Sequence, residues 1–356
     1  MNILVLNLGS TSTKAGVFDG AQEICSRTLR HDKAQLSALG GILEQKEVRK
    51  VAVLKWLSDE GYALSGMKAI AARGGLIRPI PGGVYLIDEQ AARDAASGEY
   101  GMHPSNLGML IAREWSLAAG IPAVFLDAPV TDELSARARV TGVKGITRRS
   151  VFHALNAKRV VRLYCAQEGI DPFRHRFVVA HMGGGITVSA VDGLKAVDVN
   201  NGVDGEGPFT PERAGGLPIR EVLRLLEAFG GDKERLMDAL YRQGGLTSHL
   251  GSNDVAALCA RAGNEPEVRA VLDAMLYGIA KQIGAMAAAL EGRVTRILLT
   301  GGIAYNRDLM DELTAQVGWI AGCSVFPGED ELAALAEGAL RFLSGEEQAR
   351  RVGDAG

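Results

Sequence analysis

The sequence predicts an α/β protein made of two duplicated domains around a central cleft. Residues 2–18 read as an apolar strand, a turn of glycine and hydroxyl residues, and a second strand. Residues 177–193 repeat this pattern around three glycines. Strand-like and helix-like segments alternate along the rest of the chain, which is typical of sheets flanked by helices. Two such turns half a chain apart indicate a duplication in which each half presents one turn to the cleft.

The two copies align with one residue missing from the second. Asn7–Gly9 falls opposite His181–Gly183, and Asp19-Gly20 falls opposite Asp192-Gly193. With 356 residues, the chain exceeds what one hydrophobic core usually supports. We therefore expect an N-terminal domain over 1–149, a C-terminal domain over 150–330, and a final segment, 331–356, whose helix returns to the first domain before a tail.

The expected elements follow from periodicity and from glycine and proline stop signals. Beyond the two repeated segments, strands are expected at 69–72, 123–126 and 296–300. Helices are expected at 107–119, from about 150 to 167, at 272–290, from 306 onward and at 331–343. The polar tail after Gly345 is expected to be frayed.

Composition excludes several classes of function. A net charge of −3 without a dense basic cluster argues against a nucleic-acid partner. The four cysteines are far apart and form no CxxC pair, which fits reduced thiols and a cytoplasmic location. The sequence shows neither a signal peptide nor an apolar stretch long enough to cross a membrane.

Three glycine turns are candidates for binding phosphate or nucleotide. The first glycine turn (residues 9–13) offers backbone N–H groups and hydroxyls, and Lys14 adds a positive charge. An ordinary hairpin turn explains the same residues. The third glycine turn (residues 300–306, TGGIAYN) follows a strand and precedes a helix, where open α/β sheets bind ligands. Strand–helix packing is the alternative. No GxxxxGK[ST] motif and no protein-kinase signature occurs.

Two histidines and two arginines are candidates for catalysis. His181 precedes the second glycine turn (residues 183–185), which favours a functional role. For His103, beside Pro104, functional and structural roles are equally supported. Arg73 and Arg213 lie next to glycines or in a long loop, where each is either a surface charge or a fork for carboxylate or phosphate. We interpret the remaining histidines as surface or packing residues and assign them no role; they are His31, His153, His175 and His249.

Carboxylates at two places are candidates for a metal. Asp127 follows an apolar strand, and Glu329, Asp330 and Glu331 precede the last helix. Magnesium needs only one or two carboxylates besides phosphates and waters. The acidic cluster is also explained by the dipole of the helix that it begins.

These motifs resemble the acetate and butyrate kinase family, within the larger group of actin, hexokinase and the heat-shock chaperones. NLGSTSTK and HMGGG resemble its two phosphate signatures, and TGGIAYN its adenosine-binding turn. Four further segments resemble the butyrate kinase branch in order, so the likeness covers essentially the whole chain: ARGGLIRPIPGGVY, HPSNLG, DVNNGVDGEGPFTPERAGGLP and FPGEDELAALAEGALR.

The resemblance implies two actin/hexokinase-like (ribonuclease H-like) domains and reversible transfer of the ATP γ-phosphoryl group to butyrate or a similar short-chain fatty acid. Butyryl phosphate and ADP would be the products, Mg²⁺ the cofactor, and a homodimer or larger homo-oligomer the assembly. A branched acid such as isobutyrate is an alternative substrate. A sugar kinase with Asp127 as base and a non-catalytic ATP-dependent switch are alternative functions.

The resemblance also implies roles for individual residues. Arg73 and Arg213 would clamp the phosphoryl group and the substrate carboxylate, His181 would hydrogen-bond the phosphoryl group, and His103 would contribute to the same site. Asp127 and Glu331 would position Mg²⁺, with Glu329 as an alternative to Glu331. The phosphate and nucleotide residues would be Asn7, Ser10, Ser12, Lys14, Gly183, Gly184, Gly301, Gly302 and Ile303.

One departure from the acetate kinases concerns the substrate. Gly75 stands where those enzymes resemble each other in carrying a valine. We expect the missing side chain to leave room for a longer acyl group and to favour butyrate over acetate.

Overall fold

The computed structural model describes residues 1–354, which form two compact units. Unit 1 comprises Met1–Asp132, Ala154–Asn156 and the chain from Asp330 onward. Unit 2 comprises Glu133–His153 and Ala157–Glu329. Residues 133–149 thus group with unit 2. The expected domain boundary at 149/150 stays a prediction.

Unit 1 is built on a six-stranded mixed sheet in the order β3-β2-β1-β4-β6-β5. Its strands are β1 (Asn2–Leu8), β2 (Ser12–Asp19), β3 (Gln22–Arg30), β4 (Ala69–Arg73), β5 (Val84–Leu86) and β6 (Ala123–Leu126). Its helices are α1 (Lys33–Ala38), α2 (Lys46–Asp59), α3 (Glu89–Ser97), α4 (Pro104–Ala119) and α13 (Glu331–Ser344), with short 3₁₀ turns at Leu43–Gln45, Leu64–Gly66 and Val352–Asp354.

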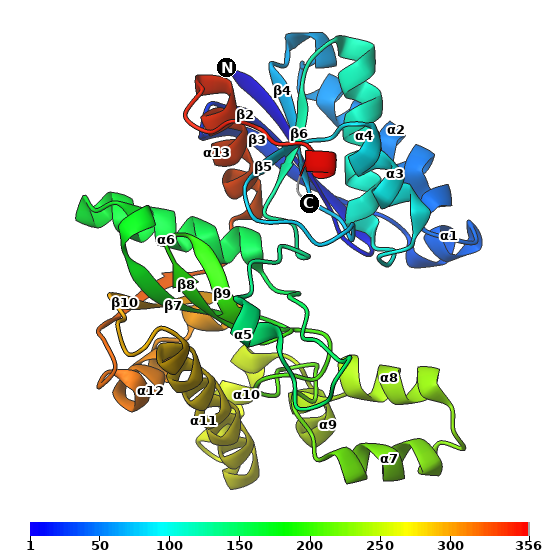
Figure 1. Ribbon diagram of the computed structural model, residues 1–356. Coiled ribbons are helices and arrows are strands. Elements are labelled where there is room, and N and C mark those ends of the chain that lie inside the picture. Colours follow the sequence, from blue (N-terminus) through cyan, green and yellow to red (C-terminus); the bar gives the residue numbers. More distant parts are fainter. Residues whose placement is uncertain (355–356) are drawn as a thin grey trace. The chain divides into compact units, whose positions relative to one another are not determined.

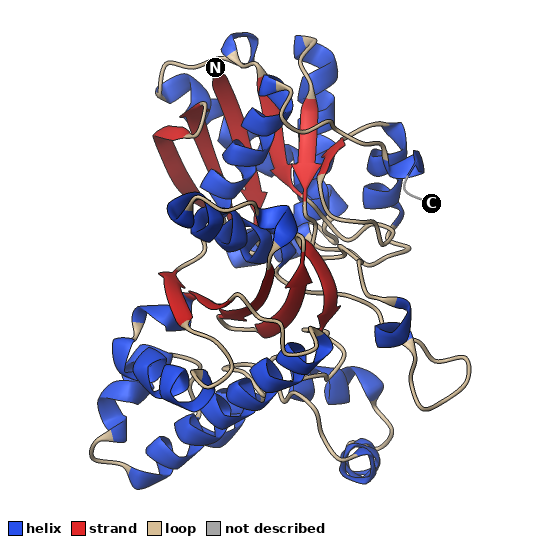
Figure 2. Ribbon diagram, turned by 60° about the vertical axis from the view of Figure 1, so that its left-hand side comes forward, coloured by secondary structure: helices blue, strands red, loops and turns tan. Residues whose placement is uncertain are grey.

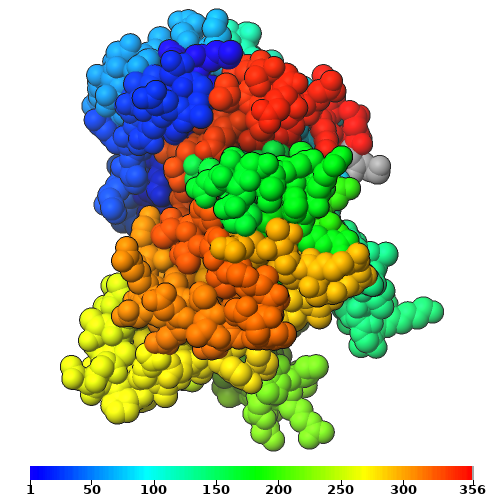
Figure 3. Space-filling model, turned by 90° about the vertical axis from the view of Figure 1, so that its left-hand side faces the viewer, coloured from blue at the N-terminus to red at the C-terminus, as the bar shows by residue number. Residues whose placement is uncertain are grey.

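The sheet of unit 1 is covered on both faces. Helices α2, α3 and α4 lie on one face and α13 on the other (Figure 1). In β1, Leu4, Leu6 and Leu8 pack toward the first face, whereas Ile3 and Val5 pack toward α13. A strand buried on both faces reads as a continuous apolar run, which explains the opening of the sequence. Figure 3 shows the red C-terminal helix of unit 1 against its blue N-terminal strands.

Unit 2 is built on a five-stranded sheet in the order β11-β10-β7-β8-β9. Its strands are β7 (Arg176–Met182), β8 (Ile186–Asp192), β9 (Lys195–Val199), β10 (Arg296–Gly301) and β11 (Cys323–Pro327). Its helices are α5 (Ala136–Arg139), α6 (Ala154–Glu168, mostly in this unit), α7 (Ile219–Ala228), α8 (Lys233–Tyr241), α9 (Gly245–Leu250), α10 (Val255–Ala262), α11 (Pro266–Ala289) and α12 (Arg307–Val317), with 3₁₀ turns at Pro172–Arg174 and Gly302–Tyr305 (Figure 2).

The two sheets have the same topology, which confirms the predicted α/β duplication. Each begins with a three-stranded antiparallel meander. A fourth strand then pairs in parallel with the first strand of the meander (β4 with β1, β10 with β7), and a fifth pairs in parallel with the fourth (β6 with β4, β11 with β10). Even the bulge recurs: the register shifts between Val17 and Phe18 in the first copy and between Ala190 and Val191 in the second. The antiparallel β5 is an addition to the first sheet.

The predicted strands and the helix faces are confirmed, with differences at boundaries. In α11, Leu272, Met275, Leu276, Ile279 and Ile283 are buried on one face, as expected for a core helix. Helix α4 begins at Pro104, three residues before the periodic pattern, because proline is favoured at the first helical position. Helix α6 begins only at Ala154, since the carbonyl of Val151 accepts a bond from the N–H of Gly202.

The prediction of a frayed tail is wrong for the residues up to 354. The N–H of Arg350 donates to the carbonyl of Val84 and that of Leu86 donates to Arg350, both at 2.9 Å. Val352 is only 2% exposed in the core of unit 1. Across residues 1–354 no helix is both long and apolar enough to span a bilayer.

Candidate functional site

In unit 1, the predicted residues gather where the parallel strands end. β1, β4 and β6 are parallel neighbours, so their carboxyl ends meet at one edge of the sheet. Asn7 lies near the end of β1, Arg73 ends β4, and Asp127 follows β6. Lys14 lies directly opposite Asn7 on β2, so the two side chains share one face. The fold therefore brings together residues far apart in the sequence at the edge where such sheets bind ligands.

Glu331 joins this group as the first residue of α13. The amide of Asn7 donates to Glu331 Oε2, and Arg73 Nε lies 3.3 Å from Glu331 Oε1. Glu329 belongs to unit 2, where its Oε1 lies 3.6 Å from His181 Nε2. Of the two alternatives for the metal, Glu331 is the one that contacts Asn7 and Arg73.

Asp127 adopts a conformation that side chains rarely take. Its φ is +40° and its side chain is 7% exposed. Oδ1 accepts a 2.9 Å bond from the N–H of Gly83, which holds the carboxylate at the strand end. Asp and Asn tolerate positive φ better than most residues, and such conformations cluster at functional sites.

Arg49, which the sequence analysis did not single out, binds the first glycine turn. Within the turn, the N–H of Gly9 donates a 2.9 Å hydrogen bond to the carbonyl of Ser12. Ser10 and Thr11 are exposed. The fully buried Arg49 of α2 donates to the carbonyls of Gly9, Ser10 and Ser12 at 2.8–3.0 Å. A signal was present: Arg49, Val53, Trp56 and Leu57 have the spacing of one helix face, which is buried.

His103 is a neutral hydrogen-bond donor. It caps α4, and its Nδ1 accepts the N–H of Ser105 at 3.2 Å. Burial, together with the charges of Arg73 and Arg49, lowers the pKa of His103 to about 4. A neutral ring whose Nδ1 accepts carries its proton on Nε2, as inferred from these bonds. At pH 7 His103 therefore offers one N–H to an oxyanion without adding charge.

The expected room beside Gly75 is not there. A Cβ built on Gly75 would lie 2.6 Å from Asn106 Oδ1 and 2.8 Å from Asn106 Cα. The fully buried Asn106 bonds to the N–H and C=O of Leu76 and to the carbonyl of Ala95. Gly75 thus permits the close approach of α4 to the loop after Arg73, and the interpretation of this glycine as space for an acyl chain is wrong. Asn106 was also missed.

In unit 2, the second glycine turn packs around Arg213. A Cβ on Gly185 would lie 2.6 Å from Arg213 Nη1, so only glycine lets the guanidinium lie against the turn. Arg213 Nη1 donates to the carbonyl of Gly202, and burial lowers the pKa of Arg213. The hydroxyl of Thr210 donates to the carbonyl of Gly184 at 2.7 Å. Gly183 lies beside His181 and Glu329, at 3.4 Å and 3.3 Å from a built Cβ.

His181 is buried at 1% exposure and stacks on a second histidine. The rings of His181 and His153 are 3.7 Å apart between centroids and nearly parallel, at 9°. His153 Nδ1 lies 2.9 Å from Thr187 Oγ1 on the neighbouring strand. His153, interpreted from the sequence as a surface or packing residue, thus packs on His181. No local pattern around His153 signals this contact.

The third glycine turn follows β10, the parallel neighbour of β7. Gly301 has a φ of +93°, and a Cβ there would lie 2.3 Å from Met182 O, so this glycine lets the third turn approach the second. Gly302 is exposed, and nothing lies within 4 Å of its built Cβ. The side chain of Ile303 is 6% exposed and packs in the core of unit 2. That Ile303 lies against a nucleotide stays a prediction.

The carboxylates fit a magnesium ion that arrives with phosphate. Among residues 1–354 no three His, Cys, Asp or Glu side chains are grouped so as to hold a metal by themselves. Asp127 and Glu331 nevertheless carry hard carboxylate oxygens, Asp127 after β6 and Glu331 against Asn7 of β1. Mg²⁺ commonly takes one or two carboxylates and completes its shell with phosphates and waters.

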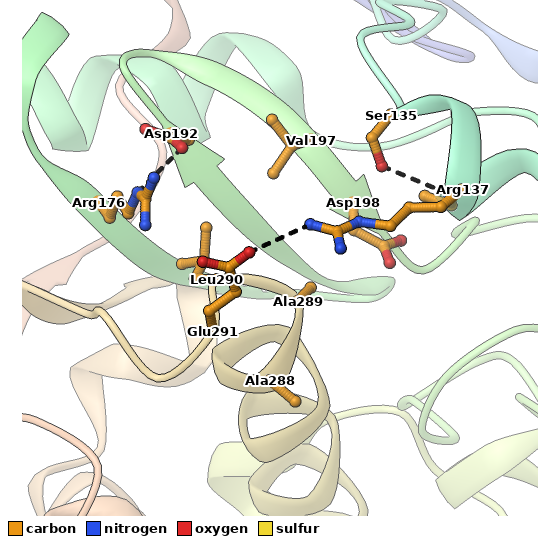
Figure 4. Close-up of a pocket in the computed structure, with 11 residues that line it drawn as sticks. Ser135, Arg137, Arg176, Asp192, Val197, Asp198, Ala288, Ala289, Leu290 and Glu291 are labelled. Carbon is orange, nitrogen blue, oxygen red and sulfur yellow. Dashed lines mark hydrogen bonds and ion pairs between the residues drawn. The ribbon is translucent and has the colours of Figure 1, made fainter.

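A separate cavity of about 440 Å³ lies in unit 2 between the β8–β9 edge and the end of α11 (Figure 4). Its cations are paired: Arg176 Nε lies 2.9 Å from Asp192, and Arg137 Nη2 lies 3.6 Å from Glu291. None of the predicted site residues lines it. Because its positive charges are already matched by carboxylates, it lacks the excess positive charge that a phosphate needs.

Two copies of one sheet topology, each with a glycine turn at the carboxyl edge, define an α/β protein of the actin and hexokinase fold. Acetate kinase from Porphyromonas gingivalis is similar over 96% of this chain and 99% of its own, with 19% identity and a TM-score of 0.77. A propionate kinase from Francisella tularensis matches 95% and 98%, with 15% identity and a TM-score of 0.76. The ROK hexokinase from Thermus thermophilus matches 97% and 100%, with 17% identity and a TM-score of 0.51.

A model of the acetokinase family matches residues 144–341, which is more than half of the chain. The chain belongs to the acetokinase family. Its activity class is accordingly that of a short-chain carboxylate kinase.

The Gly75→Ala variant should lower the free energy of unfolding by about 1–3 kcal/mol, because the added methyl group overlaps Asn106. Urea unfolding followed by tryptophan fluorescence measures this, since Trp56 and Trp115 are buried in unit 1. In the matched Gly66→Ala variant, where nothing lies within 4 Å, the change should stay within about 0.5 kcal/mol. Equal stability of the two variants would contradict the proposed contact.

His103 should make unit 1 less stable in acid. Between its ordinary pKa of 6.5 and its folded pKa of about 4, the unfolded chain binds a proton that the folded chain does not. The free energy of unfolding therefore falls as the pH decreases through this window, by about 2–3 kcal/mol between pH 7 and 4.5. His103→Asn keeps a capping acceptor but does not titrate, so its urea midpoint should fall less over the same range. Identical pH slopes for variant and wild type would disprove the assignment.

Proposed function

We propose that this protein transfers the γ-phosphoryl group of ATP to butyrate or a similar short-chain fatty acid, with Mg²⁺, forming an acyl phosphate and ADP reversibly. The observation that carries the proposal is the gathering of Asn7, Arg73, Asp127 and Glu331 at the carboxyl edge of unit 1. Family membership supports carboxylate phosphorylation, and the order of motifs that resemble the butyrate kinase branch supports the longer acid.

The chemistry asks for positioning and charge neutralisation. A carboxylate is already a nucleophile at neutral pH, so the reaction needs no general base. Its difficulty is the repulsion between the acid anion and the phosphates, and phosphoryl transfer is promoted mainly by orientation and electrostatic stabilisation. Lys14, Arg73 and Arg213 supply the required positive charge, and the neutral His103 supplies a donor.

We assign individual roles on this basis. Arg73 and Arg213 bind the transferred phosphoryl group and the substrate carboxylate, and His181 hydrogen-bonds the phosphoryl oxygens. Asp127 and Glu331 hold Mg²⁺, which when bound neutralises phosphate charge. The phosphates and the nucleotide are assigned to Asn7, Ser10, Ser12, Lys14, Gly183, Gly184, Gly301, Gly302 and the backbone of Ile303.

A substrate series tests the proposal directly. Purified protein with ATP and Mg²⁺ is given acetate, propionate, butyrate, isobutyrate or glucose, and acyl phosphate is trapped with hydroxylamine while ADP release is followed. Butyrate carries two more methylene groups than acetate, each worth ~0.8 kcal/mol when buried, so its kcat/KM should be about tenfold higher. Equal kcat/KM for acetate and butyrate would contradict the butyrate assignment.

The other outcomes identify the alternatives. A preference for isobutyrate would indicate a branched-acid kinase, and ADP release with glucose but not with carboxylates would indicate a sugar kinase. ATP binding without ADP release for any acceptor would indicate a conformational switch.

Replacement of either arginine should slow phosphoryl transfer. Arg73→Ala and Arg213→Ala should each lower kcat about 100-fold or more, the scale for losing one donor to a transition-state charge. Arg93→Ala and Arg242→Ala are matched controls, because these arginines are largely exposed, and they should retain wild-type kcat. An Arg73 or Arg213 variant with nearly full turnover would remove that arginine from the proposed site.

A further inference from the structure

The guanidinium of Arg49 donates hydrogen bonds to three carbonyls of the first glycine turn. Nη1 donates to the carbonyls of Gly9 (2.9 Å) and Ser12 (3.0 Å), and Nη2 donates to that of Ser10 (2.8 Å). On the other side, Nε and Nη2 bond to Gln45 Oε1 at 3.2 Å and 3.0 Å. The side chain is 0% exposed, so these contacts hold it in one position.

These bonds determine where the turn's N–H groups point. In a trans peptide, the C=O of one residue and the N–H of the next point in opposite directions. Because Arg49 binds the carbonyls of Gly9 and Ser10, the amides of Ser10 and Thr11 point away from it. Both residues are exposed, and within residues 1–354 neither amide donates to a protein acceptor. The turn therefore presents the N–H groups of Ser10 and Thr11 on one side, whereas the carbonyls on its other side accept hydrogen bonds from Arg49.

The positive charge of Arg49 is not matched by an acid. Its acceptors are backbone carbonyls, the hydroxyl of Thr13 and the amide oxygen of Gln45, all of them neutral. Burial lowers the pKa of Arg49, and its charge contributes to lowering the pKa of both His31 and His103. If the only role of Arg49 were to join α2 to the hairpin, a carboxylate partner would lower the free-energy cost of burying its charge.

We propose that Arg49 is a positioning residue for nucleotide phosphate: it aims the amides of Ser10 and Thr11 at a phosphate group and places an uncompensated positive charge behind them. This role rests on the proposed phosphotransfer function. It deepens that function by assigning to α2 the geometry and part of the charge of the phosphate site. Anion sites built from successive backbone amides work in this way, and a fixed cation behind the amides strengthens them.

Two variants separate this role from a purely structural brace. Arg49→Met removes both the guanidinium hydrogen bonds to the turn and the positive charge. Gln45→Glu keeps the guanidinium and its hydrogen bonds but places a carboxylate against Arg49. It therefore cancels the charge without loosening the turn. Arg113→Met is the matched control, because Arg113 of unit 1 also donates to a backbone carbonyl, that of Ile87 at 3.0 Å.

Isothermal titration with ADP and with adenosine, both with Mg²⁺, gives the decisive readout. We expect Arg49→Met to weaken ADP binding at least tenfold and Gln45→Glu about tenfold, with adenosine affinity unchanged within twofold. The melting temperature of Gln45→Glu should equal or exceed that of wild type, since it gains an ion pair. A structural brace alone cannot give weaker ADP binding in a variant of undiminished stability. Arg113→Met should bind both ligands as wild type does.

ADP binding by Gln45→Glu that matches wild type would overturn the proposal, and so would a loss of adenosine binding as large as that of ADP. Should Arg49→Met fail to fold, Gln45→Glu decides the question. The titration needs no acyl phosphate, so a failed carboxylate-kinase assay and a failed role for Arg49 give different results.

Discussion

The parallel pairing of β1, β4 and β6 is the constraint on which the candidate site of unit 1 depends. Parallel strands end at the same edge, so the residues at or after their carboxyl ends become neighbours although they are about 50 to 120 residues apart in the sequence. Asn7, Arg73 and Asp127 are placed in this way, and α13 adds Glu331. Unit 2 repeats the arrangement with β7 and β10, where His181 and the third glycine turn occupy the corresponding ends. One topology, used twice, thus supplies two edges, and to both we assign phosphate binding as a proposal.

Much of this fold could be predicted from the sequence, because strands buried on both faces leave uninterrupted apolar runs and because the glycine turns recur at a nearly constant offset. The ends of the elements were less predictable. Helix α4 starts at a proline that carries no periodicity, and the tail beyond Gly345 pairs with β5 through backbone bonds that its polar side chains do not reveal. The apolar Val352 was the one sign that this tail is packed.

From the sequence, candidate site residues can be proposed where a residue type is unusual for its position, as with Lys14 after a hydroxyl-rich turn or His181 before three glycines. They are missed where a residue looks ordinary. Arg49 lies among charged residues in the sequence, and only its spacing to Val53 and Trp56 shows that it faces the core. Gly75 shows the opposite error. A glycine was interpreted as empty space, whereas the close approach of Asn106 is what requires the small residue.

The position of α13 has a consequence for synthesis of the protein on the ribosome. This helix covers Ile3, Val5 and Phe18 of β1 and β2, yet it follows the strands of both sheets in the sequence. One side of the sheet of unit 1 must therefore stay uncovered until residues 331–344 have been made. The nascent chain carries an exposed apolar surface throughout that time, and the second sheet, contained within a central stretch of sequence, can acquire its core first.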